Sequence, residues 1–210
     1  MASVDIRKKK YKPPGSTGKI RILVLGGSQG AAIFSDLIPA AMGLMCEKIR
    51  KRINVVQQCR PELINDTQKK YCSYGIEAEI SPFFEDIPSL IGSSHLVLAR
   101  AGSSTINEVA YVGRPGVFVP YPSATDNHQM FNASQFVDAG GGWLREQNKV
   151  CPRSISNLIT RLISNPSSLL AAASSAKDFT KFGCKDNLAD LIDDIIHLKS
   201  KKNLHKRGAL

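Results

Sequence analysis

The 210-residue sequence predicts an α/β fold built on a doubly wound parallel sheet of about six strands. Three observations lead to this fold class. Short β-rich segments alternate with helical segments from residue 20 onward, the β-rich segments are continuous apolar runs, and a glycine-rich turn follows the first of them. Continuous apolar strands are typical of a parallel sheet that is covered by helices on both faces.

The expected strands are apolar runs bounded by glycine, proline or polar residues. They are residues 20–25, 53–58, 76–83, 95–100 and 116–121, with a possible sixth strand at 142–146. The expected helices are residues 30–50, about 61–73, 86–94, 104–112 and 127–138, followed by two or three helices within 152–198. Ligands of such folds bind at the carboxyl ends of the strands, so the turns that leave the strands are candidate binding loops.

The net charge of +10 is concentrated at the two ends of the chain. Residues 1–21 carry seven Lys/Arg and one acid, and residues 199–207 carry five Lys/Arg and no acid. We therefore expect a flexible basic linker at 1–19, one domain at 20–198 and a basic tail at 199–210. The tails are either solvated or attracted to an anionic membrane surface or nucleic acid. The neutral central part and its few aromatic residues make nucleic acid an unexpected partner.

The five cysteines are scattered and form no CxxC pair, which predicts reduced, mostly buried thiols. The four histidines do not cluster with acids or thiols, so we expect no metal site and no cofactor. No apolar run reaches the roughly 18 residues that span a bilayer.

The first candidate loop is "GGSQG", which follows the strand at 20–25 and contains Gly27, Ser28 and Gln29. Glycines let the backbone approach an anion, and the next helix start favours a phosphate. A tight turn without a ligand is the alternative. This loop is not the dinucleotide fingerprint, which needs G-x-G-x-x-G, and the second strand ends in Gln57 and Gln58 instead of the acid that would bind a ribose.

The second loop is "ARAGSSTINEVA", where Ser103, Ser104 and Thr105 crowd a helix start. These hydroxyls either cap the helix or mark a second anion site formed by its free N–H groups. Glu108 lies one turn further on. Its carboxylate either accepts hydrogen bonds from both hydroxyls of a ribose or is a solvated helix acid.

The third loop, residues 119–133, places Asp126, Asn127, His128 and Gln129 just before a helix. This density of donors and acceptors suits recognition of sugar hydroxyls, although Asp126 alone is also a typical helix cap and His128 a typical surface residue. Three polar turns at one sheet edge together indicate a nucleoside diphosphate with an attached sugar.

The motifs "GGSQGA", "SPFFEDI", "ARAGSSTINEVA", "GRPGVFVPYPSATDNHQMFNA" and "AGGGWLRE" occur in this order over residues 20–197. Together they resemble the C-terminal half of the MurG family, the peptidoglycan N-acetylglucosaminyltransferases that convert lipid I to lipid II. The resemblance implies a GT-B fold whose Rossmann-like C-terminal domain binds UDP-N-acetylglucosamine, with no obligatory metal. It implies an inverting transfer at the cytoplasmic face of the inner membrane.

The resemblance also assigns roles to individual residues. The glycine turn with Gly27, Ser28 and Gln29 would contact the donor, and Phe84 would meet the uracil through its backbone. Ser103, Ser104 and Thr105 would bind the phosphates, Glu108 the ribose, and Gln129 with His128 the sugar hydroxyls.

The family's N-terminal half, which holds the acceptor site and the proposed catalytic base, has no counterpart in these 210 residues. We therefore expect no catalytic base here, weak or absent transfer by the chain alone, and a lipid I acceptor bound through a missing domain or a partner chain. Two alternatives remain open. One is the soluble donor-binding subunit of a two-chain lipid-linked N-acetylglucosaminyltransferase, and the other is a non-catalytic nucleotide-sugar-binding protein.

Overall fold

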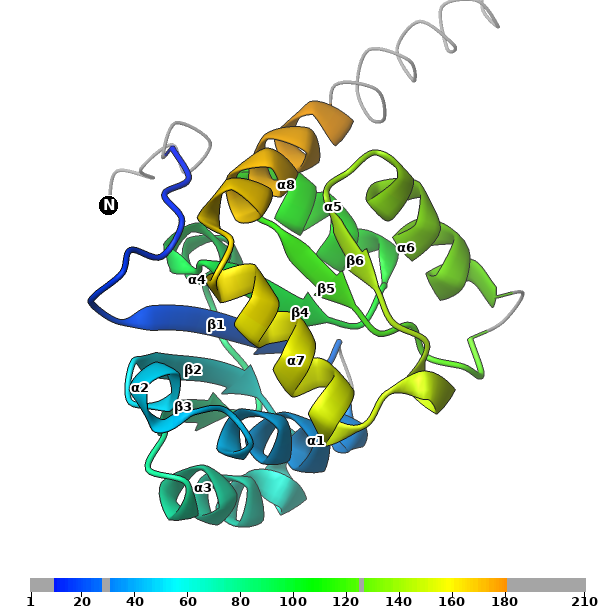
Figure 1. Ribbon diagram of the computed structural model, residues 1–210. Helices are drawn as coiled ribbons and strands as arrows, with labels where there is room; N and C mark the ends of the chain where they lie inside the picture. The colour runs from blue at the N-terminus through cyan, green and yellow to red at the C-terminus, as the bar shows by residue number, and fades with distance from the viewer. Residues whose placement is uncertain (1–9, 28–30, 125–126, 181–210) are drawn as a thin grey trace, which may run out of the picture. The chain divides into compact units, whose positions relative to one another are not determined.

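The computed structural model describes residues 10–27, 31–124 and 127–180 (Figure 1). The chain divides into units 1–179 and 180–210, and every element below belongs to the first unit. The strands are β1 (Ile20–Leu25), β2 (Ile53–Gln58), β3 (Glu77–Ser81), β4 (Leu96–Ala99), β5 (Gly116–Phe118) and β6 (Gly142–Leu144). The helices are α1 (Ala32–Gly43), α2 (Glu47–Arg50), α3 (Ile64–Ser73), α4 (Ile87–Ser93), α5 (Ser103–Val112), α6 (His128–Asp138), α7 (Pro152–Ile163) and α8 (Pro166–Phe179).

The six strands form one sheet in the order β3-β2-β1-β4-β5-β6, and all five neighbouring pairs are parallel. Ile22 in β1 lies opposite Val55 in β2 on one side and Leu96 in β4 on the other. Strands β2 and β3 follow on one side of β1, and β4, β5 and β6 follow on the other side. The predicted fold class is confirmed, and the reversal between β1 and β4 is the position where such sheets bind ligands.

Alternate residues of β1 belong to two separate apolar cores. Ile20, Ile22 and Val24 pack with α1, α3 and α7 on one face, whereas Leu23 and Leu25 pack with α4, α5 and α6 on the other. Each fully buried aliphatic side chain contributes about 1.5–3 kcal/mol relative to exposure. Both faces of β1 are thus apolar because helices cover both, which is the reason for its continuous apolar sequence.

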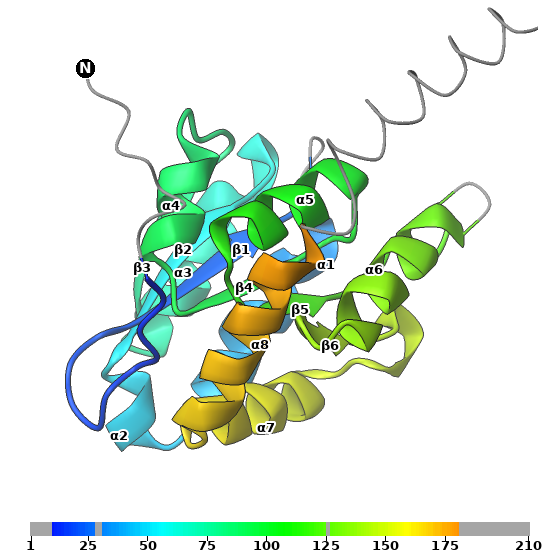
Figure 2. The ribbon, with the colours of Figure 1, turned by 90° about the horizontal axis from the view of Figure 1, so that it is seen from above.

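Helices α7 and α8 contact each other and close the described part of the chain (Figure 2). Helix α7 packs against α1, and α8 packs against α5. The expected helices within 152–198 are present as far as residue 179. The expected basic tail at 199–210 lies outside the described residues.

The helical pattern at 30–50 is two helices instead of one. Helix α1 ends at Gly43, and α2 starts after Cys46. A Cβ atom at position 43 would lie 2.5 Å from the ring of Tyr74, which extends from the end of α3. The glycine lets α3 approach the end of α1, and the chain then turns toward β2.

Residues 10–19, which precede β1, are held by hydrogen bonds that involve the side chains of Tyr11 and Arg52. The Tyr11 hydroxyl donates a hydrogen bond to the carbonyl oxygen of His95 (2.8 Å). Arg52 Nε donates to the carbonyl oxygen of Gly18 at 2.9 Å. The rest of the expected linker, residues 1–9, lies outside the described residues.

The cysteines among the described residues are free thiols, and only Cys59 is buried. The expectation of mostly buried thiols is wrong for Cys46, Cys72 and Cys151, which lie on the surface. These three sit at or next to helix ends, where the chain turns at the surface. Cys184 lies outside the described residues.

Candidate functional site

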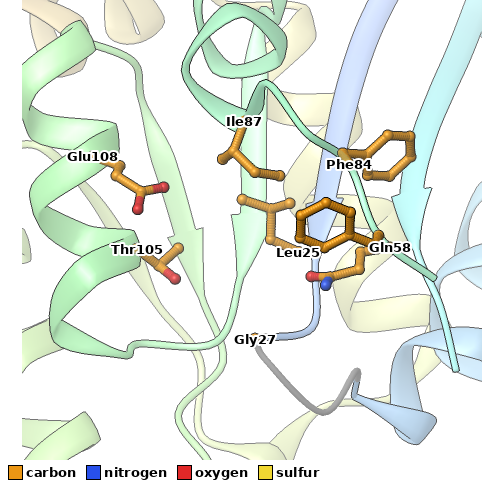
Figure 3. A pocket seen from close by; sticks show the side chains of 8 residues that line it. Leu25, Gly27, Gln58, Phe84, Ile87, Thr105 and Glu108 are labelled. Atoms are coloured by element: carbon orange, nitrogen blue, oxygen red, sulfur yellow. The ribbon is translucent and has the colours of Figure 1, made fainter. Parts of the chain in front are cut away.

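A cavity of about 150 Å³ opens at the carboxyl ends of the central strands (Figure 3). It lies at the reversal between β1 and β4, where the fold class predicts a ligand. One wall is the first half of α5, and the loop between β3 and α4 forms the opposite side. The lining residues are Leu25, Gly27, Gln58, Phe83, Phe84, Ile87, Thr105 and Glu108.

Helix α5 starts without a side-chain cap among the described residues. Its N-cap residue is Gly102, which has no side chain to accept a hydrogen bond, and Ile106 N donates the first helical bond, to Gly102 O at 3.0 Å. The N–H groups of Ser103, Ser104 and Thr105 precede that bond and have no acceptor within the helix. The capping interpretation of the three hydroxyls is therefore wrong, because they follow the cap position. This helix end can bind an anion through N–H groups and the helix dipole.

Thr105 and Glu108 point from α5 into the cavity (Figure 3). They are three residues apart, so they share one face of the helix. Partial burial raises the pKa of the Glu108 carboxyl above its usual value. A carboxylate with part of its hydration removed is a strong acceptor for hydroxyl donors.

The loop between β3 and α4 is fixed at both ends. The Ser81 hydroxyl donates to the carbonyl oxygen of Phe83 (2.6 Å), and Asp86 caps α4 by accepting from Ser89 N at 3.0 Å. The hydrogen bond from Ser89 lowers the pKa of Asp86. Between these points Phe84 packs on the apolar core, while Phe83 is 68% exposed. The loop thus presents a fixed backbone and two aromatic rings at the cavity.

Gln129 connects the ends of two strands. Its Oε1 accepts hydrogen bonds from Tyr121 N (2.9 Å) and Ala101 N (3.3 Å). On the next turn of α6, Asn132 Nδ2 donates to Ala101 O at 3.2 Å. The amide oxygen of Gln129 thus holds the backbone at the ends of β4 and β5 together.

The structure brings four predicted site residues together around the cavity: Gly27, Phe84, Thr105 and Glu108. Ser103 and Ser104 are exposed at the start of α5. His128 and Gln129 lie at the start of α6 and do not line this cavity. The candidate residues Ser28, Gln29 and Asp126 lie outside the described residues.

The sequence reasoning missed the lining residues Leu25, Gln58, Phe83 and Ile87. For Gln58, position was the available signal, because it is the last residue of a predicted strand. Leu25 and Ile87 resemble ordinary core residues in a sequence, so only the fold distinguishes them.

Arg100 is a further residue near the site that was not predicted from the sequence. It directly follows β4 and is 8% exposed. Its guanidinium donates to the carbonyl oxygens of Val119 (2.9 Å) and Pro120 (3.0 Å) and to Gln147 Oε1 (2.6 Å). Burial lowers its pKa. The side chain fixes the end of β4, and with it the turn that leads into α5, to the end of β5.

In the three described ranges, no three His, Cys, Asp or Glu side chains are placed to hold a metal ion. In the same ranges, no helix is both long and apolar enough to cross a bilayer.

Comparison with known families gives a match over most of the chain. Residues 21–191 match the glycosyltransferase family 28 C-terminal domain. The chain belongs to this family. The family 28 domain accounts for all six strands and for α1–α8.

Two curated relatives from different bacteria have the same protein name. The UDP-N-acetylglucosamine--N-acetylmuramyl-(pentapeptide) pyrophosphoryl-undecaprenol N-acetylglucosamine transferase of Granulibacter bethesdensis is 44% identical over 185 residues, which are 88% of this chain and 47% of the relative. The transferase of the same name from Zymomonas mobilis is 42% identical over 90% of this chain and 49% of its own. The chain thus spans about half the length of the curated relatives it matches.

Solved structures lead to the same group. The crystal structure of Acinetobacter baumannii MurG superposes with a TM-score of 0.69 and 30% identity, covering 83% of this chain and 48% of that one. A glycosyltransferase of lipopolysaccharide biosynthesis, WaaG, has a TM-score of 0.62 at 16% identity, covering 86% of this chain and 48% of its own, and shares the fold alone. The resemblance inferred from the motifs is confirmed for the C-terminal half.

Proposed function

We propose that this family 28 domain is the UDP-N-acetylglucosamine-binding half of a transferase that adds N-acetylglucosamine to lipid I. The names of the relatives supply the donor and the acceptor. The proposal covers donor binding by this chain and transfer by the complete enzyme.

The observation that carries the proposal is the arrangement of α5 beside the cavity. One helix presents N–H groups without an acceptor in the helix at its start, Thr105 at its third position and Glu108 one turn later. A nucleoside diphosphate has the complementary order of groups: an anion, a ribose diol and a flat base. In this arrangement the diphosphate lies at the start of α5, the ribose hydroxyls donate to Glu108, and the base enters the cavity.

The same arrangement favours departure of UDP. When an acceptor hydroxyl attacks the anomeric carbon, the bond to the diphosphate breaks and negative charge grows on the leaving oxygen. N–H groups and a helix dipole that already point at this position stabilise that charge without reorganising. Gln129, through its amide nitrogen and together with His128, would orient the sugar on the side of α6.

The acceptor hydroxyl and the base that takes its proton belong, in this proposal, to the other half of the relatives. The isolated chain would therefore bind donor and transfer poorly or not at all. Either a further domain or a partner chain would bind lipid I. The reaction would take place at the cytoplasmic face of the inner membrane, and Lys8, Lys9, Lys10 and Lys12 would add attraction to its anionic surface.

Calorimetric titration of the 210-residue chain with UDP-N-acetylglucosamine tests donor binding. We expect saturable binding that Glu108→Gln weakens at least tenfold, since the ribose loses a charged acceptor. Glu62→Gln is the matched control, because Glu62 is exposed and outside the cavity. NADH should not bind. Absence of UDP-sugar binding, or equal affinity of the Glu108→Gln variant, would contradict the proposal.

A further inference from the structure

Gln58 faces Thr105 and Glu108 across the cavity (Figure 3). It is the last residue of β2, whereas the other two polar side chains come from α5. The cavity therefore has polar groups on two opposite sides. The proposed function uses only the α5 side and leaves the amide of Gln58 without a role.

The neighbouring glutamine in the same strand has a purely internal role. Gln57 is fully buried, and its Oε1 accepts a 2.6 Å hydrogen bond from the hydroxyl of Tyr71. Successive side chains of a strand point to opposite faces, so Gln58 must point to the other side of β2. The face of β2 beneath α1 and α3 therefore accounts for the amide oxygen of Gln57, whose Nε2 has no hydrogen-bond partner among the described residues. Gln58 lies on the other face, at the cavity.

The shape of the cavity indicates which part of a ligand it holds. Its volume of about 150 Å³ is below the roughly 300–1,000 Å³ of complete small-molecule sites. Leu25, Phe84 and Ile87 supply apolar lining between the two polar sides. A single flat ring with apolar faces and a polar edge, such as a pyrimidine base, fits this combination.

The present hydrogen bond of Gln58 indicates the group that it would read. Its Nε2 donates to the carbonyl oxygen of Pro82 at 3.4 Å. Good N–H···O bonds are about 2.7–3.2 Å long, so this bond is weak and is readily exchanged for a better one. The replacement acceptor would be another carbonyl oxygen, and a uracil ring carries two of them.

We propose that Gln58 is a specificity-determining residue whose Nε2 donates a hydrogen bond to a carbonyl oxygen of the donor's pyrimidine base. The inference rests on the proposed function, since it names the residue that reads the base in the same site. It adds a side-chain contact from β2 to the backbone contact expected near Phe84.

The test is a calorimetric titration of the 210-residue chain and its variants with UDP. Gln58→Met keeps the length of the side chain and removes the donor, so UDP should bind about 3- to 10-fold more weakly. Gln58→Glu places a negative charge against a carbonyl oxygen, so the loss should exceed tenfold. Gln68→Met is the control: Gln68 is exposed on α3, away from the cavity, and its variant should bind UDP like the wild type.

A spectroscopic measurement separates a direct contact from a structural effect on the loop. The side-chain amide signals of Gln58 in a ¹H–¹⁵N spectrum are assigned by their loss in Gln58→Met. They should shift on addition of UDP to the wild-type chain, while the Gln68 signals stay in place. Unchanged Gln58 signals at saturation, or wild-type affinity of Gln58→Met, would overturn the inference alone. No UDP binding by the wild type would overturn the proposed function with it.

Discussion

The Tyr11 hydroxyl and the His95 carbonyl oxygen form a 2.8 Å hydrogen bond between residues 84 positions apart. The Tyr11 ring also lies 5.4 Å from the guanidinium carbon of the buried Arg114. This pair attaches the segment that precedes β1 to the turn that precedes β4. Burial raises the pKa of Tyr11, and that of the fully buried Tyr71, well above the usual tyrosine value.

Tyr11→Phe should lower the free energy of unfolding by about 1 kcal/mol, since it leaves the His95 carbonyl without this donor. A raised pKa also means that the folded chain favours the neutral phenol. The stability that the neutral Tyr11 phenol gives the folded chain is complete below about pH 10, where an exposed tyrosine ionises. It is lost as the pH rises further. Urea unfolding at pH 8 and pH 10.5 measures this effect. The free energy of unfolding should fall less between the two pH values for Tyr11→Phe than for the wild type. Tyr74→Phe, which removes an exposed tyrosine hydroxyl, is the matched control for the loss at pH 8.

Glu108→Gln should separate stability from ligand binding. Because burial raises the pKa of this carboxyl, its charged form disfavours folding above the ordinary glutamate pKa. Removing the charge should therefore leave the Tm at pH 7 unchanged or raise it by up to about 2 °C. UDP affinity of the wild type should fall as the pH is lowered through the raised pKa of Glu108, and the variant should lack this part of the pH dependence. A Tm loss of several degrees would contradict the assignment of Glu108 to binding.

Arg100→Met should lower the free energy of unfolding by about 2–6 kcal/mol, at about 1–3 kcal/mol for each of the two buried carbonyl oxygens that lose their charged donor; the half-buried Gln147 loses it as well. The Arg100→Lys variant should recover only part of this loss, because an ammonium cannot reproduce the forked geometry of guanidinium. Arg153→Met on the exposed surface should stay within about 0.5 kcal/mol of the wild type in the same urea titration.

Gly142→Ala should disrupt the pairing of β6 with β5. A Cβ atom at this position would lie 2.0 Å from the backbone oxygen of Gly116, which cannot move aside without breaking the ladder. We expect a loss of at least about 2 kcal/mol in the free energy of unfolding. Gly15→Ala is the control, since its nearest atom would be 3.6 Å away. Equal stability of both variants would show that β6 adjusts more freely than the sheet register indicates.

The central strands of the sheet were predictable because buried parallel strands are apolar on both faces, as β4, β5 and most of β1 are. The edge strand β3 is only partly buried, and β6 was expected only as a possible strand. The α5 side of the site was predictable for a related reason: the polar turn after a buried strand lies at the edge of the sheet, and Glu108 is on the second turn of the helix that starts there. The break between α1 and α2 was not, since it depends on Tyr74 packing over Gly43, a contact between distant parts of the chain. Gln58 and Arg100 were missed because the roles of a terminal strand residue depend on which loops fold over it.

The uncapped start of α5 affects how often the first turn of this helix opens. A helix end without a cap is about 1 kcal/mol less stable than a capped one, so the first turn of α5 should open more often than its middle. Any anion that accepts hydrogen bonds from these N–H groups would take the place of the absent cap. Amide exchange at Ser103–Thr105 should then slow on nucleotide addition, which makes these three positions an internal reporter of whether the site is occupied.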